Sequence, residues 1–295
     1  MQGARPEPVL AVVPTYRPPH AVQSLVASLR AQGMPVAVVD DASPCTTDRL
    51  LAGLARMPGV DVLRNPRNAG IARSLNQGLA LAQSTGASWL LTVDQDSALP
   101  SDFLQGLLAA ATSPRIGVIG PETIGDASGD LDYPTWTEDG LLLTHEVFQT
   151  GALWSVAALG RVGGFDERLA MDGVDAAACL RLREAGYQVA LAPGLALAHQ
   201  VGGARQVTLL GRSVVVSHHP PARRFSILRN RLRLAPAEFR QSPVHAFRTL
   251  RRVALQSALA VTVEDQRAAK ARAIGRALLP SRGGRRPRGA RSSSA

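Results

Sequence analysis

The stretch WLLTVDQDS at residues 89–97 decides how this chain folds. Its first five residues form an apolar run typical of a buried strand, and Asp94 and Asp96 follow directly. Side chains two positions apart on an extended chain point to the same side, so both carboxylates can face one cation. Ligands of open α/β sheets gather at the carboxyl ends of strands, and carboxylate oxygens favour Mg²⁺ or Mn²⁺. The stretch therefore predicts a divalent metal site; the alternative is a loop whose aspartates cap the helix that Pro100 announces.

Apolar runs alternate with helical patterns on both sides of this stretch. We expect strands at residues 9–13, 36–39, 60–63, 89–93 and 116–119. We expect helices at residues 20–30, 71–83 and 103–111, where apolar side chains recur every three or four positions. This alternation predicts a parallel sheet with helices on both faces. The polar, glycine-rich residues 125–140 are expected to form a loop over the site.

The pattern changes after residue 140. Strands of antiparallel or mixed pairing are expected at residues 141–147 and 152–156, a helix at residues 175–185 and a last short strand at residues 189–192. We therefore expect an α/β domain over residues 1–215, a helical basic extension over residues 216–280 and a disordered arginine-rich tail over residues 281–295.

Composition excludes several classes of protein. The 295 residues are 45% hydrophobic and 19% charged, which is typical of a globular chain. Cys45 and Cys179 lie far apart without a metal spacing, so neither a disulfide framework nor a zinc site is indicated, and a reducing compartment fits. No apolar run approaches the roughly 18 residues that a membrane span needs, and residues 1–8 lack the apolar core of a signal peptide. We expect a cytoplasmic protein.

The net charge of +10 is concentrated at the end of the chain. Nine basic residues and no acid follow residue 266, which leaves a net charge of +1 for the residues before it. Basic segments bind nucleic acid or anionic lipid. Aromatic residues make up only 4% of the chain and none interleaves this tail, so a base-stacking nucleic-acid module is not indicated. We expect the tail to contact an anionic membrane surface at the inner face of the cell membrane, and we expect no nucleic-acid partner.

Three further segments accompany the two aspartates in a fixed order. Pro14-Thr15-Tyr16 follows the first expected strand, VDDAS at residues 39–43 follows the second, and NAGIARSLN spans residues 68–76. Together with DQDS at residues 94–97 they resemble inverting family 2 glycosyltransferases of the GT-A fold, and within them the bacterial rhamnosyltransferases. The resemblance covers about residues 8–235. It implies an α/β GT-A fold, a mixed sheet flanked by helices, followed by a basic helical C-terminal extension.

The resemblance assigns roles to individual residues. Asp40 would face the nucleotide base, and Arg229, in RRFSILRN at residues 223–230, would close toward the diphosphate. The residues implied to bind the donor are Pro14, Thr15, Tyr16, Asp40, Asp41, Asn68, Gly70, Arg73, Asp94, Gln95 and Arg229. The residues implied to hold the metal are Asp94, Asp96 and His199. The alternatives are ordinary turn formation after the first two strands, a helix cap at Asn68 and a packed histidine at His199.

Inverting transfer also needs a base for the acceptor hydroxyl. The resemblance places Asp175 at that position in MDGVDAAACLR, residues 171–181, with Asp172 as the alternative base and a helix N-cap as the alternative role. The chain departs from the family pattern nearby, because Val174 stands where many members carry Glu and residues 176–178 are alanines. GGFDE at residues 163–167 resembles a turn that shapes the backbone below the acceptor site.

As a whole, the resemblance implies a metal-dependent inverting glycosyltransferase that uses Mg²⁺ or Mn²⁺. The implied donor is dTDP-L-rhamnose, and the implied acceptor is a cell-envelope glycan or a polyprenyl-linked saccharide. UDP-galactofuranose or a UDP-hexose is the alternative donor within this class. A nucleotide-sugar-binding protein or a nucleic-acid-binding protein without turnover is the alternative outside it.

Overall fold

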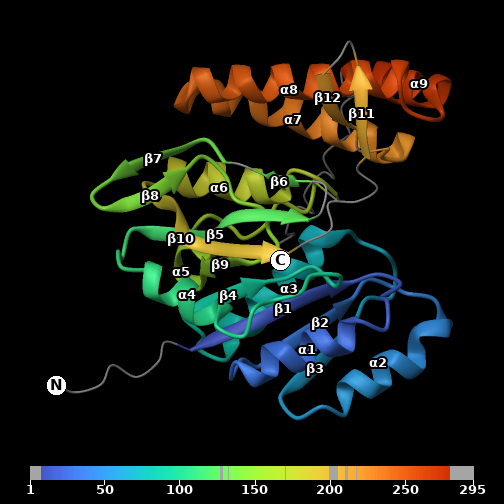
Figure 1. The fold of residues 1–295 in the computed structure, drawn as a ribbon. Helices are drawn as coiled ribbons and strands as arrows, with labels where there is room; N and C mark the ends of the chain where they lie inside the picture. Colours follow the sequence, from blue (N-terminus) through green and yellow to red (C-terminus); the bar gives the residue numbers. More distant parts are fainter. Residues whose placement is uncertain are drawn as a thin grey trace, which may run out of the picture.

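The computed structural model describes residues 8–126, 129–131, 133–169, 171–198, 205–209, 212–216 and 218–279. In these residues a mixed β-sheet forms the centre of the molecule, with helices on both faces and a further layer of helices from the end of the chain (Figure 1). His199 and the tail over residues 281–295 lie outside the described residues. The alternation of strands and helices that the sequence predicted is confirmed.

One sheet contains ten of the described strands. Their bounds are β1 Val9–Thr15, β2 Val36–Asp40, β3 Val60–Arg64, β4 Trp89–Thr92, β5 Ile116–Asp126, β6 Gly129–Leu131, β7 Thr135–Glu138, β8 Leu141–Thr144, β9 Ala152–Ser155 and β10 Gln188–Ala198. They pair in the order β3-β2-β1-β4-β9-β5-β10-β8-β7, with β6 added to β5. β3, β2, β1 and β4 pair in parallel, whereas β9 runs antiparallel to both β4 and β5. The sheet is therefore mixed, and β9 inserts between two strands that precede it in the chain.

Helices cover both faces of this sheet. Their bounds are α1 Val22–Ala31, α2 Asp48–Ala55, α3 Ile71–Ser84, α4 Phe103–Ala110, α5 Val156–Arg161 and α6 Val174–Glu184, with a 3₁₀ turn, η1, at Cys45–Thr47. Side chains of β1 alternate between two cores, as the pleat of a strand requires. Val9, Ala11 and Val13 join the core under α1, α2 and α4, and Leu10 and Val12 join the core under α3, α5 and α6.

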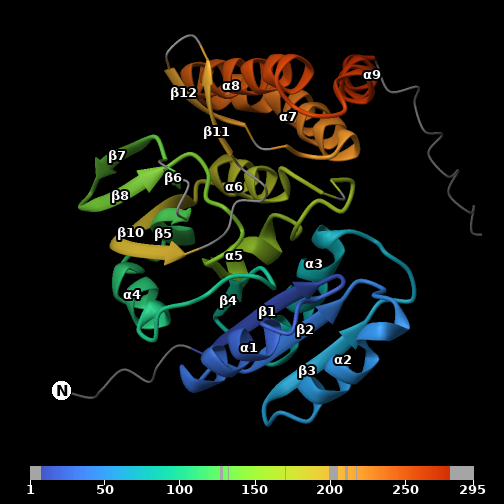
Figure 2. The same cartoon turned by 45° about the vertical axis from the view of Figure 1, so that its right-hand side comes forward.

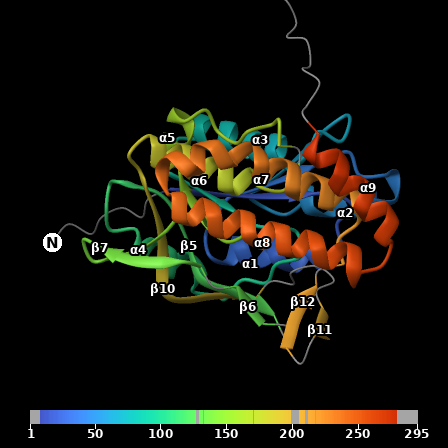
Figure 3. The ribbon, with the colours of Figure 1, turned by 90° about the horizontal axis from the view of Figure 1, so that it is seen from above.

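The end of the chain adds a hairpin and three helices. Their bounds are β11 Arg205–Leu209, β12 Arg212–Val216, α7 Pro221–Gln241, α8 Pro243–Thr262 and α9 Arg267–Leu278. α7 contacts α6, and α8 and α9 pack on α7, so this layer covers the α6 side of the molecule (Figures 1 and 2). Seen from above, α7 and α8 lie side by side across the molecule (Figure 3). Proline begins both helices, where the first N–H has no helical partner to lose.

A buried ion-pair cluster fastens these three helices to one another. Glu264, just after α8, accepts hydrogen bonds from Arg224 of α7 and from Lys270 of α9, and Lys270 Nζ lies 2.7 Å from Glu264 Oε2. The side chains of Arg224, Glu264 and Lys270 are 4%, 0% and 3% exposed. Breaking a buried pair leaves an uncompensated charge, at a cost of about 3–5 kcal/mol. The cluster therefore sets how α7, α8 and α9 are packed together.

Residues 125–140 do not form the loop that we expected. β5 continues to Asp126, β6 pairs with the end of β5, and β7 forms a hairpin with β8. β7 lies at the edge of the sheet and is exposed along its whole length. Its residues therefore do not alternate between core and solvent, and the period-two signal of a strand is missing.

Three other elements differ from the sequence-based expectations. β10 is longer than the strand that we expected at residues 189–192, because a register irregularity between Ala192 and Ala196 accommodates Pro193 and Gly194 within it. The short helices α2 and α5 and the β11–β12 hairpin were not expected. In the described parts of the chain, none of the helices is long and apolar enough to cross a membrane.

Candidate functional site

The loops after β1, β2 and β4 meet at one edge of the sheet, because parallel strands end at the same edge. Gln95, in the loop after β4, joins two of these loops. The Tyr16 amide donates to Gln95 Oε1 at 3.0 Å, and Gln95 Nε2 donates to the Tyr16 carbonyl at 3.2 Å. Pro14 and Thr15 end β1 just before, where Thr15 is buried and Tyr16 is exposed. The structure therefore brings the first and last of the expected donor segments together.

Asp40 is fully buried at the end of β2. Its Oδ2 accepts from the Ser43 amide at 3.1 Å and lies 3.3 Å from Arg64 Nε. Its Oδ1 is buried and has no hydrogen-bond partner among the described residues. A buried acceptor without a donor is unfavourable, so this oxygen is poised to accept a hydrogen bond from a ligand.

Asp41, the next residue, binds one side-chain amide and two backbone amides of the protein itself. Its Oδ1 accepts from Asn65 Nδ2 and from the Ala69 amide, both at 2.9 Å, and its Oδ2 accepts from the Gly70 amide at 2.9 Å. Asn68 Nδ2 donates to the Asp41 carbonyl at 3.3 Å. Gly70 has φ 89°, a left-handed conformation that glycine adopts without strain. Asp41 therefore orients the loop that leads into α3.

The expected donor residue Arg73 projects from the first turn of α3. Its Nη1 lies 3.4 Å from Glu167 Oε2, and both side chains are about half exposed. Asn76, one turn later, fixes the GGFDE turn: its Nδ2 donates to the Phe165 carbonyl at 2.9 Å and its Oδ1 accepts from the Phe165 amide at 2.7 Å. α3 therefore connects the loop after β2 to the turn before α6.

Asp94 is held at the end of β4 by residues that precede β9. Its backbone amide donates to Thr150 Oγ1 at 3.0 Å, and Gln149 Nε2 donates to Asp94 Oδ1. Thr150 Oγ1 also lies 2.8 Å from Ser97 Oγ. Sequence reasoning missed Gln149 and Thr150, because they reach Asp94 only through the insertion of β9 beside β4. No local sequence pattern at these residues predicts that insertion.

Negative charge is concentrated around Asp94. Burial, together with the charges of Asp96 and Asp175, raises the pKa of Asp94 to about 7. A divalent cation would relieve this repulsion, and carboxylates are ligands that Mg²⁺ and Mn²⁺ accept. Asp96 is exposed, two residues along the same loop. The donor set therefore fits a divalent cation held by Asp94 and Asp96, while ligation by His199 stays a prediction.

Asp175 lies in the first turn of α6, and its Oδ1 accepts from the Ala176 amide at 2.8 Å. Burial and the charge of Glu146 raise the pKa of Asp175 to about 6, against the opposing charge of Arg231. Because Asp175 in turn raises the pKa of Asp94, the two carboxylates lie near enough to repel each other. A carboxylate with a pKa near 6 is largely ionised at neutral pH and is a stronger base than an ordinary one.

The three alanines after Asp175 pack inside the protein. Ala176, Ala177 and Ala178 are 2%, 3% and 0% exposed. Ala177 and Ala178 belong to the core under α3, α5 and α6. These positions, which depart from the family pattern, therefore fill the protein interior with small apolar side chains beneath the site.

Asp172, the alternative base, is engaged by Arg223. Arg223 Nε donates to Asp172 Oδ1 at 3.1 Å, and Asn230 Nδ2 donates to the carbonyls of Met171 and Asp172, both at 2.8 Å. Burial raises the pKa of Asp172, and the charge of Arg223 opposes that rise. The charge of Arg223 also lowers the pKa of Asp94. Arg223 therefore supplies positive charge to this site.

Arg229, which we expected at the diphosphate, contacts the end of α9. Its Nη1 donates to the carbonyls of Ala277, at 3.0 Å, and Leu279, at the end of α9. Arg223 and Arg229 are six positions apart on α7, which turns their side chains to different faces of the helix. The structure thus brings Arg223 to the site and uses Arg229 to join α7 to α9.

A second group missed by sequence reasoning lies behind Asp175. Arg231 of α7 pairs with Glu146, which precedes β9, and Glu238 Oε2 lies 3.5 Å from His245 Nε2. Oxygen and nitrogen atoms of Glu146, Glu238 and His245 all lie within 4.8 Å of one another. Arg231 occupies both oxygens of Glu146 and brings its own positive charge, so we assign this group to an ion-pair network rather than to a metal.

Three of the six described non-glycine residues with positive φ lie in this region. Arg17 after β1, Ala42 after β2 and Asp172 before α6 have φ 51°, 62° and 58°. Left-handed backbone at a residue with a side chain costs on the order of 1 kcal/mol. Such strain tends to occur at functional sites, where the surrounding structure holds it in place. The three positions surround the residues described above.

Solved proteins that bind nucleotide sugars share this fold. Mannosyltransferase PcManGT from Pyrobaculum calidifontis, solved in complex with GDP-Man and Mn²⁺, aligns with a TM-score of 0.58 at 19% identity, over 94% of this chain and 81% of that one. S. aureus TarS 1-349, in complex with UDP-GlcNAc, aligns with a TM-score of 0.59 at 16% identity, over 92% and 80%. At these identities the likeness establishes the fold alone. It is the GT-A fold that the motifs implied, with carboxylates where its strands end.

Residues 10–152 match the model of the family described as Glycosyl transferase family 2, and together with the relatives named next this match identifies the protein as a glycosyltransferase. The dTDP-rhamnosyl transferase RfbF of Shigella flexneri is 27% identical over 237 residues, which cover 75% of this chain and 78% of that protein. The N-acetylglucosaminyl-diphospho-decaprenol L-rhamnosyltransferase of Mycobacterium tuberculosis is 27% identical over 233 residues, which cover 65% and 75%. The resemblance to rhamnosyltransferases is confirmed.

Proposed function

We propose that this chain transfers L-rhamnose from dTDP-L-rhamnose to an acceptor hydroxyl with inversion at the anomeric carbon, and that it needs Mg²⁺ or Mn²⁺. The observation that carries the proposal is the placement of Asp94 at the end of β4, where Gln149 and Thr150 hold it, with Asp175 of the first turn of α6 near enough to repel it. The proposed transfer needs a carboxylate that binds a cation beside the leaving group and a second carboxylate that acts as a base beside the acceptor. Asp94 and Asp175 would fill these two roles.

The choice of donor rests on two observations. Both relatives described above are named as rhamnosyl transferases, and one name contains dTDP. Asp40 Oδ1, buried and without a partner among the described residues, is suited to accept the ring N–H of a pyrimidine base. Thymine and uracil both carry that N–H, so Asp40 supports a pyrimidine nucleotide and the relatives support thymine over uracil.

In the proposed reaction, the acceptor oxygen bonds to the anomeric carbon as the bond from that carbon to the diphosphate oxygen breaks. Asp175 takes the proton of the hydroxyl, and the electron pair of the broken bond leaves with dTDP. The cation, when bound at Asp94 and Asp96, offsets the charge of the leaving diphosphate. Arg223 adds positive charge on the same side, because its charge already acts on Asp94. Asp41 and Gln95 hold the donor loops in position.

We propose a cell-envelope glycan or a polyprenyl-linked saccharide as the acceptor. One relative carries N-acetylglucosaminyl-diphospho-decaprenol in its name, which supports an acceptor linked to a lipid. The residues that follow Asp175 in α6 are buried. The acceptor would therefore reach Asp175 from a side other than the one that these residues occupy.

Thermal unfolding with nucleotides tests the donor. The protein is melted with dTDP, UDP or GDP, each with Mn²⁺, with Mg²⁺ or with EDTA. We expect dTDP to raise the melting temperature most, and only with a cation, because ligands stabilise the state that binds them. A preference for UDP would replace dTDP-L-rhamnose by UDP-galactofuranose or a UDP-hexose as the proposed donor. It would leave the assignment as a glycosyltransferase unchanged. Equal melting with and without every nucleotide would overturn the site itself.

A further inference from the structure

α8 presents a row of apolar and basic side chains to solvent. Val244, Phe247 and Leu255 are 62%, 63% and 60% exposed, and Arg248 and Arg251 between them are exposed as well. Their spacing of three and four positions places all five on one face of the helix. Exposed apolar residues of this size are unusual on a helix unless something covers them.

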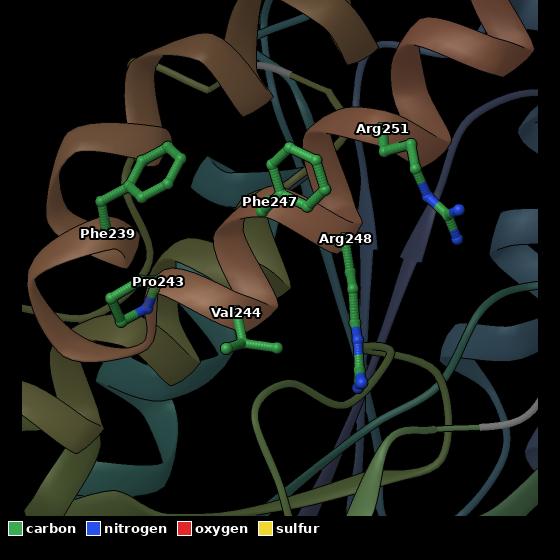
Figure 4. Close-up of a pocket in the computed structure, with 6 residues that line it drawn as sticks. All are labelled: Phe239, Pro243, Val244, Phe247, Arg248 and Arg251. Carbon is green, nitrogen blue, oxygen red and sulfur yellow. The ribbon is translucent and has the colours of Figure 1, made fainter.

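The row continues across the junction with α7. Phe239, near the end of α7, is 41% exposed, and Pro243 begins α8. With Val244, Phe247 and the two arginines these residues line an open hollow of about 570 Å³ (Figure 4). Phe239 and Phe247 point from neighbouring helices, so two aromatic rings emerge on one side of the molecule (Figure 4). We call this surface, made of Phe239, Pro243, Val244, Phe247, Arg248, Arg251 and Leu255, the α8 face.

The opposite side of α8 already makes the contacts that fold the helix. Ala246, Val253 and Ala260 recur every seven positions and are buried. Val253 joins the small core shared with α7 and α9. The exposed apolar residues are therefore additional to those that pack α8 onto the protein, and folding alone does not explain them.

The charge of the α8 face has one sign. Residues 239–262 contain four arginines, Arg240, Arg248, Arg251 and Arg252, and no aspartate or glutamate. Glu238, just before this stretch, is 4% exposed and turned inward toward His245. A helix with large apolar side chains and arginines on one face suits the boundary between lipid headgroups and acyl chains. Guanidinium groups bind lipid phosphates while the apolar side chains reach below them.

We propose that the α8 face docks the protein on an anionic lipid bilayer, with α8 lying in the plane of the membrane surface. Phe239 and Phe247 insert between the headgroups, and Arg248 and Arg251 bind the lipid phosphates. This surface is separate from the arginine-rich tail, and the proposal does not depend on which sugar or acceptor the enzyme uses. Docking through α8 places the glycosyltransferase against the membrane by a folded element of the chain.

Vesicle flotation tests the proposal with the full-length protein. Vesicles of phosphatidylcholine alone are compared with vesicles that contain phosphatidylglycerol, at low and high salt. We expect binding to the anionic vesicles that weakens as salt rises. In the same chain, Arg248→Gln with Arg251→Gln should weaken binding tenfold or more, because each basic residue near an anionic surface contributes substantially. Arg49→Gln with Arg56→Gln removes equal charge from exposed positions in α2 and directly after it, and this pair should leave binding unchanged.

The apolar part of the α8 face needs its own variant. Phe247→Ser with Leu255→Ser should weaken binding at both salt concentrations, and all these variants should melt like the wild-type protein because the sites are exposed. The tryptophan fluorescence added by Phe247→Trp should be quenched by lipids brominated near the headgroup, whereas the fluorescence added by Arg56→Trp should not be. Wild-type binding by both double variants of the α8 face would overturn the proposal. So would a change from dimer to monomer caused by Phe247→Ser without any vesicle binding, since the face would then join two copies of the chain.

Discussion

Glu146 and Arg231 form a two-armed ion pair, with Arg231 Nη1 2.7 Å from Glu146 Oε2 and Nη2 2.9 Å from Oε1. The pair joins the residues before β9 to α7, so the C-terminal helices contact the sheet domain close to Asp175. The two charges act on Asp175 in opposite senses: Glu146 raises the pKa of Asp175 and Arg231 lowers it. α7 therefore takes part in setting the basicity of the proposed base.

We predict that the acid limb of kcat/KM lies near pH 6. Asp175 must be ionised to accept a proton, and the folded protein raises its pKa from an ordinary 3.8 to about 6, chiefly through burial. Activity is therefore lost as pH falls through about 6, about two units above the limb of an ordinary aspartate. The pH dependence of kcat/KM, which reports groups of the free enzyme, measures this.

Variants of the ion pair should move that limb in opposite directions. Glu146→Gln removes a charge that raises the pKa of Asp175, so its limb should move to lower pH; Arg231→Gln should move it to higher pH, each by about half a unit or more. Glu184→Gln, at the other end of α6, is the control and should leave the limb in place. Movement of both limbs in one direction would contradict the coupling.

We predict that Asp175→Asn lowers kcat by a factor on the order of 10² or more and leaves donor affinity near the wild-type value. The amide keeps the size of the side chain and cannot accept the proton, so the loss falls on the transition state. Single-turnover transfer and dTDP binding measure the two quantities. Asp172→Asn is the comparison, because Asp172 pairs with Arg223. The base assignment is wrong if Asp172→Asn loses kcat and Asp175→Asn does not.

We predict that Asp96→Ala abolishes both turnover and the cation-dependent part of dTDP binding. Asp96 shares with Asp94 the concentration of negative charge that a cation would neutralise. Binding of dTDP with Mn²⁺ and with EDTA, measured by calorimetry, gives the difference. Asp102→Ala is the matched control: Asp102 is exposed, follows in the same loop and makes no side-chain cap to α4. Full activity in excess EDTA would refute the metal site.

We predict that Gly78→Ala destabilises the protein by about 1–2 kcal/mol, although alanine is the better helix former. A Cβ at position 78 of α3 would lie 2.5 Å from Val12 Cγ2, and Val12 is fully buried in β1. Overpacking costs about 1–3 kcal/mol and exceeds the propensity gain of about 1 kcal/mol. Chemical denaturation measures the change.

Gly275→Ala in α9 is the control for that substitution. Among the described residues, no atom lies within 4 Å of the Cβ that alanine would add at position 275. The propensity gain then acts alone, so this variant should stabilise the protein by up to about 1 kcal/mol. Equal effects of the two substitutions would show that α3 does not pack as closely on β1 as the structure indicates.

The sequence predicted those parts of the fold whose signal is local. Residues 9–13 and 36–39 are buried on both faces of the sheet, so their apolar runs were sufficient. β7 is exposed throughout and carries no such run, which is why it was taken for a loop. The ion pair between Glu146 and Arg231 spans 85 positions, and no pattern in either segment refers to the other.

The lack of a local signal also explains why the sequence did not predict which arginine of α7 lies at the site. We expected the segment at residues 223–230 to close toward the diphosphate, but a helix carries its arginines on several faces. Arg223 reaches Asp172, and Arg229 reaches the end of α9. Which of them faces the site depends on the rotation of α7 about its own axis, and contacts such as the buried Arg224–Glu264 pair set that rotation.

The position of β9 constrains the order in which this protein can be completed during synthesis. β4 and β5 leave the ribosome first, yet each pairs with β9 and not with the other. The central sheet therefore stays open until residue 155 has been made, and the gap closes by insertion rather than by extension at an edge. Gln149 and Thr150 arrive with that same insertion, so Asp94 gains its supporting contacts in the step that closes the sheet.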